Sequence, residues 1–113
     1  MEQYELKKLD LDALHLVYHD HLTPDFPPAE RKPLAAMEKL LSAGRYEPWG
    51  LYQGEELMAY AMMWKDPEGG FELLDYLGVC QGKPRGEGIG TVMVAYLMDH
   101  YSHVEGVLVE AEA

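Results

Sequence analysis

Cysteine and long apolar runs are both scarce in this chain. Cys80 is the only cysteine among 113 residues, so an internal disulfide is excluded and a reducing compartment is expected. No apolar run approaches the roughly 20 residues that a membrane span requires, and no N-terminal segment has the charged and apolar parts of a signal peptide. We therefore expect a cytoplasmic protein that has no membrane partner.

Positive charge is scarce as well. The chain has 9 lysines and arginines against 20 aspartates and glutamates, which gives a net charge of −11. Because nucleic-acid binding depends on cations that neutralise phosphates, we expect no nucleic-acid partner. An acidic surface suits a cationic or amine-bearing partner, although it serves solubility equally well. A chain of this length forms at most one domain, residues 1–113, and is long enough to bury a core.

The apolar residues that are present change their spacing along the chain, and the spacing predicts the elements. Helical spacing and strand-like alternation first predict a strand over 4–9, a helix from the N-cap Asp10 to about Leu22 and a helix from Leu34 to Gly44. A hairpin of strands 48–52 and 57–64 is predicted next, followed by a strand over 71–79. The last two predicted elements are a helix from Ile89 to about Ser102 and a strand over 106–110. The prolines between Thr23 and Pro28 are expected to stop the first helix.

This order, β-α-α-β-β-β-α-β, predicts an α/β fold with one mixed sheet. The strand over 71–79 is nearly apolar on both faces, as in a central strand that helices cover on each side. The helix that follows it makes a right-handed crossover, so the fourth and fifth strands are expected to be parallel.

A glycine-rich turn joins that central strand to the last helix. Gly86, Gly88 and Gly90 can take positive φ and let the backbone approach a ligand, and the helix adds unpaired N–H groups and the positive end of its dipole. The turn is therefore expected to bind an anion. It is not a Walker A loop, because no Gly-Lys-Ser/Thr follows, and it lies too late in the chain for a dinucleotide fingerprint.

The run Arg85-Gly-Glu-Gly-Ile-Gly90 fits the pattern Arg/Gln-x-x-Gly-x-Gly/Ala and follows the apolar strand end Leu77-Gly-Val79. This pattern resembles the acyl-CoA signature of the GNAT superfamily of N-acetyltransferases. The predicted order of elements over residues 4–110 is similar to that of the family. The resemblance implies an enzyme that binds acetyl-CoA as cosubstrate and transfers the acetyl group to a primary amine by direct attack on the thioester, without a metal.

The resemblance also implies which residues bind the cosubstrate. The backbone of Leu77, Gly78 and Val79 would pair with the pantetheine arm, where the fourth and fifth strands splay apart. The pyrophosphate would be bound by N–H groups of the glycine turn, by the Arg85 side chain and by the Thr91 hydroxyl. The turn residues concerned are Gly86, Glu87, Gly88, Ile89 and Gly90. The side chains of Leu77 and Val79 would be core in any case.

Two carboxylates on the central strand are candidates for the base that deprotonates the amine. These are Asp75 and Glu72, and either one could instead be a structural or solvated acid. Strict alternation places Asp75 with Leu77 and Val79, and Glu72 with Leu74 and Tyr76, whereas a bulge would change this assignment. Asp75 is slightly favoured. Glu110 is a third acidic candidate, or plain surface.

The C-terminus departs from the family pattern. The resemblance implies a further helix and a closing hairpin, which often supplies a tyrosine that protonates the thiolate, and this sequence ends at Ala113 before them. Neither Tyr96 nor Tyr101 matches that tyrosine by position. We therefore expect a fragment, a natural truncation, or a homodimer that covers the open sheet edge. The alternative function is a non-catalytic acyl-CoA-binding or assembly module, and the amine acceptor is unknown.

His15 and His19 are four residues apart and could bind a metal from one helical face. No acidic or cysteine ligand with matching spacing accompanies them, so we expect no metal site. Cys80 is expected to be a small apolar residue at a strand end rather than a nucleophile, because no histidine is placed to activate it.

Overall fold

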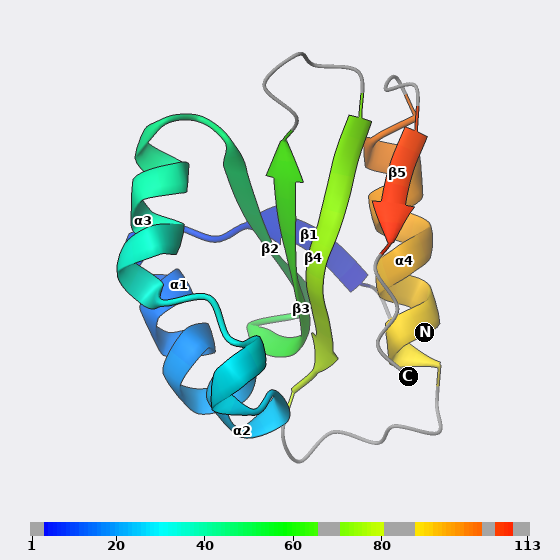
Figure 1. Ribbon diagram of the computed structural model, residues 1–113. Helices are drawn as coiled ribbons and strands as arrows, with labels where there is room; N and C mark the ends of the chain where they lie inside the picture. The colour runs from blue at the N-terminus through cyan, green and yellow to red at the C-terminus, as the bar shows by residue number, and fades with distance from the viewer. Residues whose placement is uncertain (1–3, 66–70, 81–87, 103–105, 110–113) are drawn as a thin grey trace.

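The computed structural model describes residues 4–65, 71–80, 88–102 and 106–109 and contains one mixed sheet with helices on both faces (Figure 1). The order of strands in the sheet is the order in the chain, with β1 and β5 at its edges. The strands are β1 (Tyr4–Lys8), β2 (Tyr46–Gln53), β3 (Glu56–Lys65), β4 (Phe71–Val79) and β5 (Gly106–Val109). Strands β1 to β4 pair antiparallel, and β5 pairs parallel with β4 through the crossover helix.

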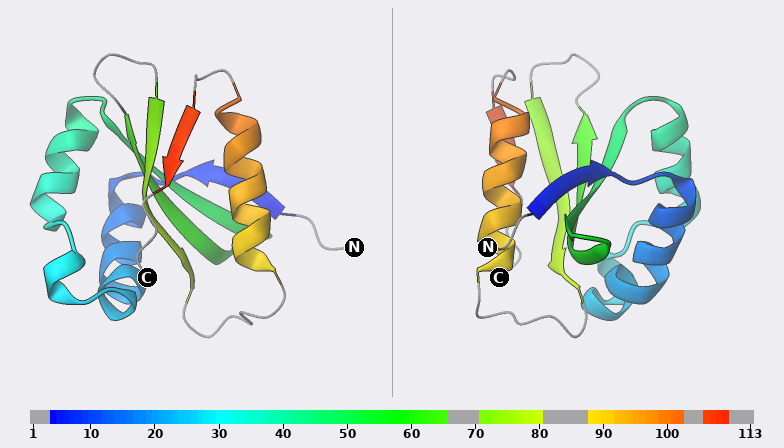
Figure 2. Two further views of the ribbon diagram at one scale, coloured as in Figure 1. Left: turned by 45° about the vertical axis from the view of Figure 1, so that its right-hand side comes forward. Right: turned by 180° about the vertical axis from the view of Figure 1, so that it is seen from behind.

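The helices lie in two layers, one on each face of the sheet. The short helices α1 (Leu11–Val17), α2 (Thr23–Asp25) and α3 (Leu34–Ser42) cover one face, and α4 (Ile89–His100) covers the other (Figure 2). No helix in the described ranges is long and apolar enough to cross a bilayer.

The first helix begins as predicted and ends later than predicted. The Asp10 carboxylate caps α1 by accepting a hydrogen bond of 2.8 Å from the Ala13 N–H. The chain then continues through a π-helical turn, Tyr18–Leu22, into α2, so helical structure extends to Asp25. The segment 23–28 does end the helix, but at Asp25 instead of about Leu22, because Pro24 lies in the first turn of α2, where no N–H is needed.

The helix α3 has the boundaries that its sequence predicts. Pro33 is its N-cap residue, and Gly44 follows the C-cap with a φ of 74°. That left-handed conformation is cheap only for glycine, which explains why the helix ends here. A 3₁₀ turn, Pro28–Glu30, connects α2 to α3.

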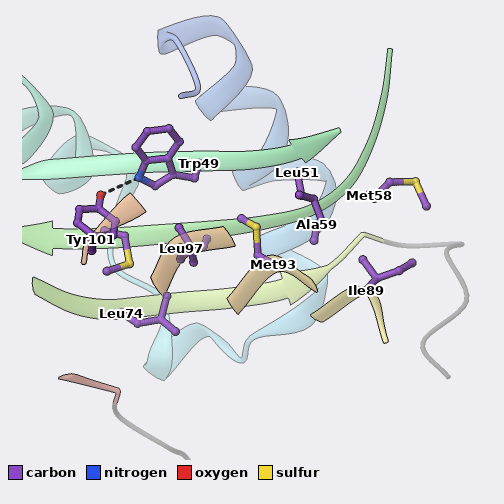
Figure 3. Close-up of a cluster of buried hydrophobic side chains, with 11 residues drawn as sticks. Trp49, Leu51, Met58, Ala59, Leu74, Ile89, Met93, Leu97 and Tyr101 are labelled. Carbon is purple, nitrogen blue, oxygen red and sulfur yellow. Dashed lines mark hydrogen bonds between the residues drawn. The ribbon is translucent and has the colours of Figure 1, made fainter. Parts of the chain in front are cut away.

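Each face of the sheet has its own buried core. On the α4 side, Leu51, Ala59 and Leu74 of the sheet pack against Ile89, Met93 and Leu97 of the helix (Figure 3). On the other side, the buried cluster contains Leu9, Leu14, Val17, Leu22, Met37, Tyr46, Tyr60, Met62, Tyr76 and Cys80. Two covered faces explain why β4 is apolar on both sides.

A bulge interrupts β4 at Asp75. The neighbours Met62 and Met63 on β3 pair with Tyr76 and Leu74, so Asp75 is the extra residue on the bulged strand. Leu74 therefore packs on the α4 side, whereas Tyr76 packs on the side of α1 to α3. The assignment by strict alternation, which grouped Tyr76 with Leu74, is wrong, and the alternative with a bulge is correct.

Candidate functional site

The two parallel strands separate halfway along β4. Only Phe71–Leu74 pair with β5, through partners 106–109. From Tyr76 to Val79 the strand pairs with β3 on one side, and no described strand lies on its other side. Backbone N–H and C=O groups at such an edge can bind an extended ligand as an added strand. The predicted pantetheine-binding residues, Leu77, Gly78 and Val79, lie in this part of β4.

The helix α4 begins at the same end of the molecule at which β4 ends (Figure 1). Its N-cap is Gly88, with φ 76° and ψ 19°, and among the described residues no side chain caps the first N–H groups. The prediction of a left-handed glycine is confirmed here. Gly90 lies inside the first turn, so its contribution is space rather than positive φ. The buried side chain of Ile89 fixes this end of the helix to the core.

Of the other residues predicted to bind the pyrophosphate, the structure describes only some. Thr91 follows Gly90 in the first turn of α4, at the end of the helix that favours anions. Arg85, Gly86 and Glu87 lie outside the described residues, as does Glu110. A methyl group on Gly90 would be 3.9 Å from Val79 Cγ2, so the first turn of the helix lies against the end of β4.

Gly78 has a packing role in addition to its predicted backbone role. It pairs with Tyr60 on β3, and the buried Tyr60 ring crosses the place that a side chain would occupy. A Cβ at Gly78 would lie 2.6 Å from Tyr60 Cζ and 2.7 Å from Cε1. Real Cβ atoms do not approach so closely, so glycine is required unless the ring moves.

We therefore expect Gly78→Ala to destabilise the fold by about 1–3 kcal/mol, because the new methyl group overpacks a rigid core position. Urea unfolding followed by circular dichroism measures this. In a Tyr60→Leu background, which removes the ring, the same substitution should cost much less. An equal cost in both backgrounds would contradict the clash.

The carboxylate of Asp75 lies at the point where β4 and β5 separate, directly after the last paired residue, Leu74. Its Oδ2 atom accepts a hydrogen bond of 2.9 Å from Lys32 Nζ and one of 2.7 Å from Tyr46 Oη. The Asp75 side chain is 17% exposed, so it is held in place and remains accessible. Burial, followed by the neighbouring Asp75, raises the pKa of Tyr46 far above its ordinary value, so the phenol remains a donor.

Lys32 is held in turn by two tyrosines. Its backbone N–H donates to Tyr76 Oη at 2.7 Å, and its carbonyl accepts from Tyr18 Oη at 2.8 Å. Its Nζ atom lies 5.4 Å from the centre of the Tyr46 ring. The segment before α3 is thus fixed to the bulge of β4. Sequence reasoning missed Lys32 and Tyr46, because they are 43 and 29 residues from Asp75 and no local pattern marks them.

The second candidate, Glu72, lies in the α4-side core. It is 2% exposed, pairs in register with Val107 of β5, and is therefore in the closed part of the strand pair. Burial and the neighbouring Glu47 carboxylate raise the pKa of Glu72 to about 7. Within the described residues its Oε2 atom has no hydrogen-bond partner.

Glu47 belongs to a buried hydrogen-bond network. Trp49 Nε1 donates to Tyr101 Oη at 2.8 Å (Figure 3). The Tyr101 hydroxyl donates in turn to Glu47 Oε1 at 2.8 Å. Burial alone would raise the pKa of Glu47, but the hydrogen bond from Tyr101 and the nearby Lys8 lower it on balance. Tyr101 thus serves this network, on the face of the sheet opposite to Asp75.

The histidine pair and the cysteine have structural surroundings. His15 Nε2 lies 2.8 Å from Glu38 Oε1 on α3, an exposed contact between two helices. Within the described ranges, no group of three or more His, Cys, Asp or Glu side chains is arranged to hold a metal ion. Cys80 is buried in the core at the end of β4.

Several solved structures that resemble this chain are acetyltransferases. A GNAT family acetyltransferase of Staphylococcus aureus has a TM-score of 0.68 at 10% identity, with 100% of this chain and 89% of that chain covered. A ribosomal-protein-alanine N-acetyltransferase of Brucella melitensis has 0.66 at 19%, with 97% and 81% covered. A predicted acetyltransferase of Clostridium acetobutylicum, with acetyl-CoA, has 0.67 at 13%, with 97% and 82% covered. At these identities, the likeness establishes the fold alone.

The sequence comparisons give the family. No curated protein matches the chain significantly. The family model described as Acetyltransferase (GNAT) family matches residues 14–112, which include the bulge of β4, the glycine turn and α4. Since this match covers most of the sequence, the chain belongs to the GNAT family of acetyltransferases.

Proposed function

We propose that this chain binds acetyl-CoA at the open part of β4 and the start of α4, and transfers the acetyl group to a primary amine. The observation that carries the proposal is that Asp75 lies where β4 and β5 separate, while the strand edge beyond it leads to a helix N-terminus capped by Gly88. An extended thioester with a diphosphate needs these two features, a strand edge and an anion site, at one end of a sheet.

Each predicted residue has one task in this proposal. Backbone groups of Leu77, Gly78 and Val79 pair with the pantetheine arm. The N–H groups of Gly88, Ile89 and Gly90, with the Thr91 hydroxyl, bind the pyrophosphate. The family resemblance adds Arg85, Gly86 and Glu87 to the same site. The glycines offer backbone without a Cβ, which suits close approach of a bulky phosphate group.

Asp75 acts as the base in this proposal. It accepts a proton from the amine, directly or through one water molecule, so that the nitrogen lone pair can attack the thioester carbonyl. A C–N bond forms, the C–S bond breaks, and the sulfur leaves with the bonding pair as a thiolate that takes up a proton. Lys32 and Tyr46 position the carboxylate through its Oδ2 atom. Glu72 is the weaker candidate, because it is buried beside the closed part of the strand pair.

We also propose that the protein is cytoplasmic and forms a homodimer. In the described part of the sheet β5 is an edge strand, and a second copy of the chain could cover that edge. The alternative function is a non-catalytic acyl-CoA-binding or assembly module, which would bind acetyl-CoA without transferring its acetyl group.

Two measurements test the proposal and separate it from the alternative. Calorimetric titration with acetyl-CoA should give saturable binding, and no binding at millimolar ligand would refute both functions. Release of free thiol from acetyl-CoA, followed over a panel of primary amines, should depend on the amine. Binding without amine-dependent release would favour the non-catalytic module.

Gly90→Ala separates a ligand role of the turn from a folding role. Alanine inside a helix is favoured over glycine by about 0.5–1 kcal/mol, and the added methyl group would make only an ordinary contact with Val79, so the fold should become slightly more stable. Acetyl-CoA binding should nevertheless weaken about tenfold, or about 1.4 kcal/mol, because the methyl group obstructs the phosphate. Thermal melting and calorimetric titration measure the two effects.

Gly44→Ala is the matched control, since Gly44 has a φ of 74° at the end of α3 with nothing within 4 Å of a new Cβ. It should destabilise the fold by about 1–2 kcal/mol through left-handed strain and leave acetyl-CoA affinity unchanged. Unchanged affinity in Gly90→Ala would mean that the pyrophosphate does not lie against this turn.

A further inference from the structure

A groove lined by apolar and basic residues lies along α3. Its volume is about 410 Å³, and its lining residues are Lys32, Ala36, Lys39, Leu40, Ala43 and Arg45. The spacing of the helical members, three or four residues apart, places them on one face of α3. The alanines and Leu40 form the apolar part, and the three cations come from before, within and after the helix.

The charge of this groove is opposite to the charge of the chain. Only 9 residues of the chain are lysine or arginine, and three of them line this one groove, while no aspartate or glutamate of the described ranges does. Among the described residues, Lys39 and Arg45 form no salt bridge, and the partner of Lys32 is Asp75. A cluster of cations in an otherwise acidic protein repels itself unless an anion is bound there.

Lys32 connects the groove to the proposed catalytic carboxylate. Lys32 belongs to both, because it lines the groove and its Nζ atom lies 2.9 Å from Asp75 Oδ2. From Leu34 to Lys39 the helix advances five residues, which is about 7.5 Å at the helical rise of about 1.5 Å per residue, and the non-helical step from Lys32 through Pro33 brings the span to about 10 Å. A molecule whose amine lies at Asp75 can therefore place a group near Lys39 and Arg45 if its two ends are about 10 Å apart.

We propose that the acceptor is an amphipathic amino acid or a short peptide, with a primary amine at one end, an apolar middle and a carboxylate at the other end. The amine lies at Asp75, the apolar part lies over Leu40 and the alanines, and the carboxylate binds Lys39 and Arg45. Arginine offers a carboxylate two parallel hydrogen bonds, and lysine adds a compact positive charge. This inference rests on the proposed acetyl transfer, since it names the acceptor for that site.

Three amines of equal length test the charge preference, because they differ only at the far end. These are 8-aminooctanoate, octylamine and 1,8-diaminooctane, which end in a carboxylate, a methyl group and an ammonium group. The value of kcat/KM, measured by thiol release at saturating acetyl-CoA, should be at least tenfold higher for 8-aminooctanoate than for the diamine. An equal or higher value for the diamine would overturn the inference.

Charge-neutralising variants then locate the preference. Lys39→Gln and Arg45→Gln should each reduce the ratio of aminooctanoate to octylamine several-fold, mainly through KM, and together they should abolish it. Lys7→Gln changes the net charge by the same amount far from the groove, at a lysine 3.8 Å from Glu5, and should leave the ratio unchanged. A ratio that persists in the double variant would overturn the inference.

The failure of the proposed function is distinguishable from the failure of this inference. If acetyl-CoA does not bind, or no amine is acetylated, the proposed function fails. Binding of 8-aminooctanoate, followed by chemical shifts of α3 amides, still tests the groove without turnover. Saturable shifts for aminooctanoate that are absent for the diamine and lost in the double variant would support the anionic group, and shifts equal for both amines would refute it.

Discussion

Replacing Asp75 with asparagine is expected to lower kcat/KM for acetyl transfer by about a hundredfold or more, while acetyl-CoA affinity stays unchanged. General-base catalysis by a positioned side chain contributes about 10²- to 10⁴-fold, and an amide cannot accept the proton of the amine. Asparagine has the same shape, and its carbonyl oxygen can still accept from Lys32 and Tyr46, so the loss should be chemical rather than structural. Steady-state thiol release, with calorimetric titration of acetyl-CoA, measures both parts.

The pH dependence of Asp75→Asn distinguishes a base from a merely structural acid. If Asp75 accepts the proton, the variant should regain part of its rate at high pH, where more of the amine is already neutral. Glu72→Gln is the matched control on the same strand and should retain near-normal kcat/KM. A hundredfold loss in Glu72→Gln with little effect in Asp75→Asn would reverse the assignment of the base.

Much of the fold could be predicted because the spacing of apolar residues and the capping residues are local features of the sequence. Alternation identified Phe71–Val79 as a strand with apolar residues on both faces, and the structure covers it on both faces. The Asp10 cap and the left-handed Gly44 and Gly88 are local features of one or two residues, and each lies where it was expected. The late end of the first helix is the exception, since proline in the first turn of α2 did not stop it.

The side-chain arrangement of the candidate site depends on contacts that no local pattern contains. Whether β4 has a bulge depends on its pairing with Met62 and Met63 of β3, so the face of Asp75 could not be read from β4 alone. Its partners, Lys32 and Tyr46, come from the segment before α3 and from the start of β2. Only tertiary packing brings these three residues together.

Net charge gave little information about the acceptor. The value of −11 suits a cationic or amine-bearing partner and serves solubility equally well, whereas the groove beside Asp75 is lined by Lys32, Lys39 and Arg45. A sum over the chain determines the field far from the protein, but a ligand within a few ångströms responds to the nearest charges. The local arrangement should therefore determine which acceptor binds.

The Glu72 side chain predicts an unusual dependence of stability on pH. Its pKa is about 7 in the folded protein against an ordinary value of 4.5, because it is buried beside Glu47. The folded state therefore binds this proton more tightly than the unfolded state does, and stability is lost as the pH rises from about 4.5 to about 7. The difference between the two pKa values corresponds to about 3 kcal/mol. The lowered pKa of Glu47 acts in the opposite direction, below this window.

Glu72→Gln removes this charge at every pH and keeps the shape of the side chain. At pH 8 the variant should be more stable than the natural chain by about 3 kcal/mol, or about 10 °C in Tm, and at pH 4.5 the two should nearly coincide. Thermal melting at both pH values measures the difference. Glu5→Gln, at a side chain that is 70% exposed, should change stability by less than about 0.5 kcal/mol at either pH. If Glu72→Gln were instead less stable at pH 8, the carboxylate would have to be charged and paired in the fold, and the unpaired Oε2 atom within the described residues argues against that arrangement.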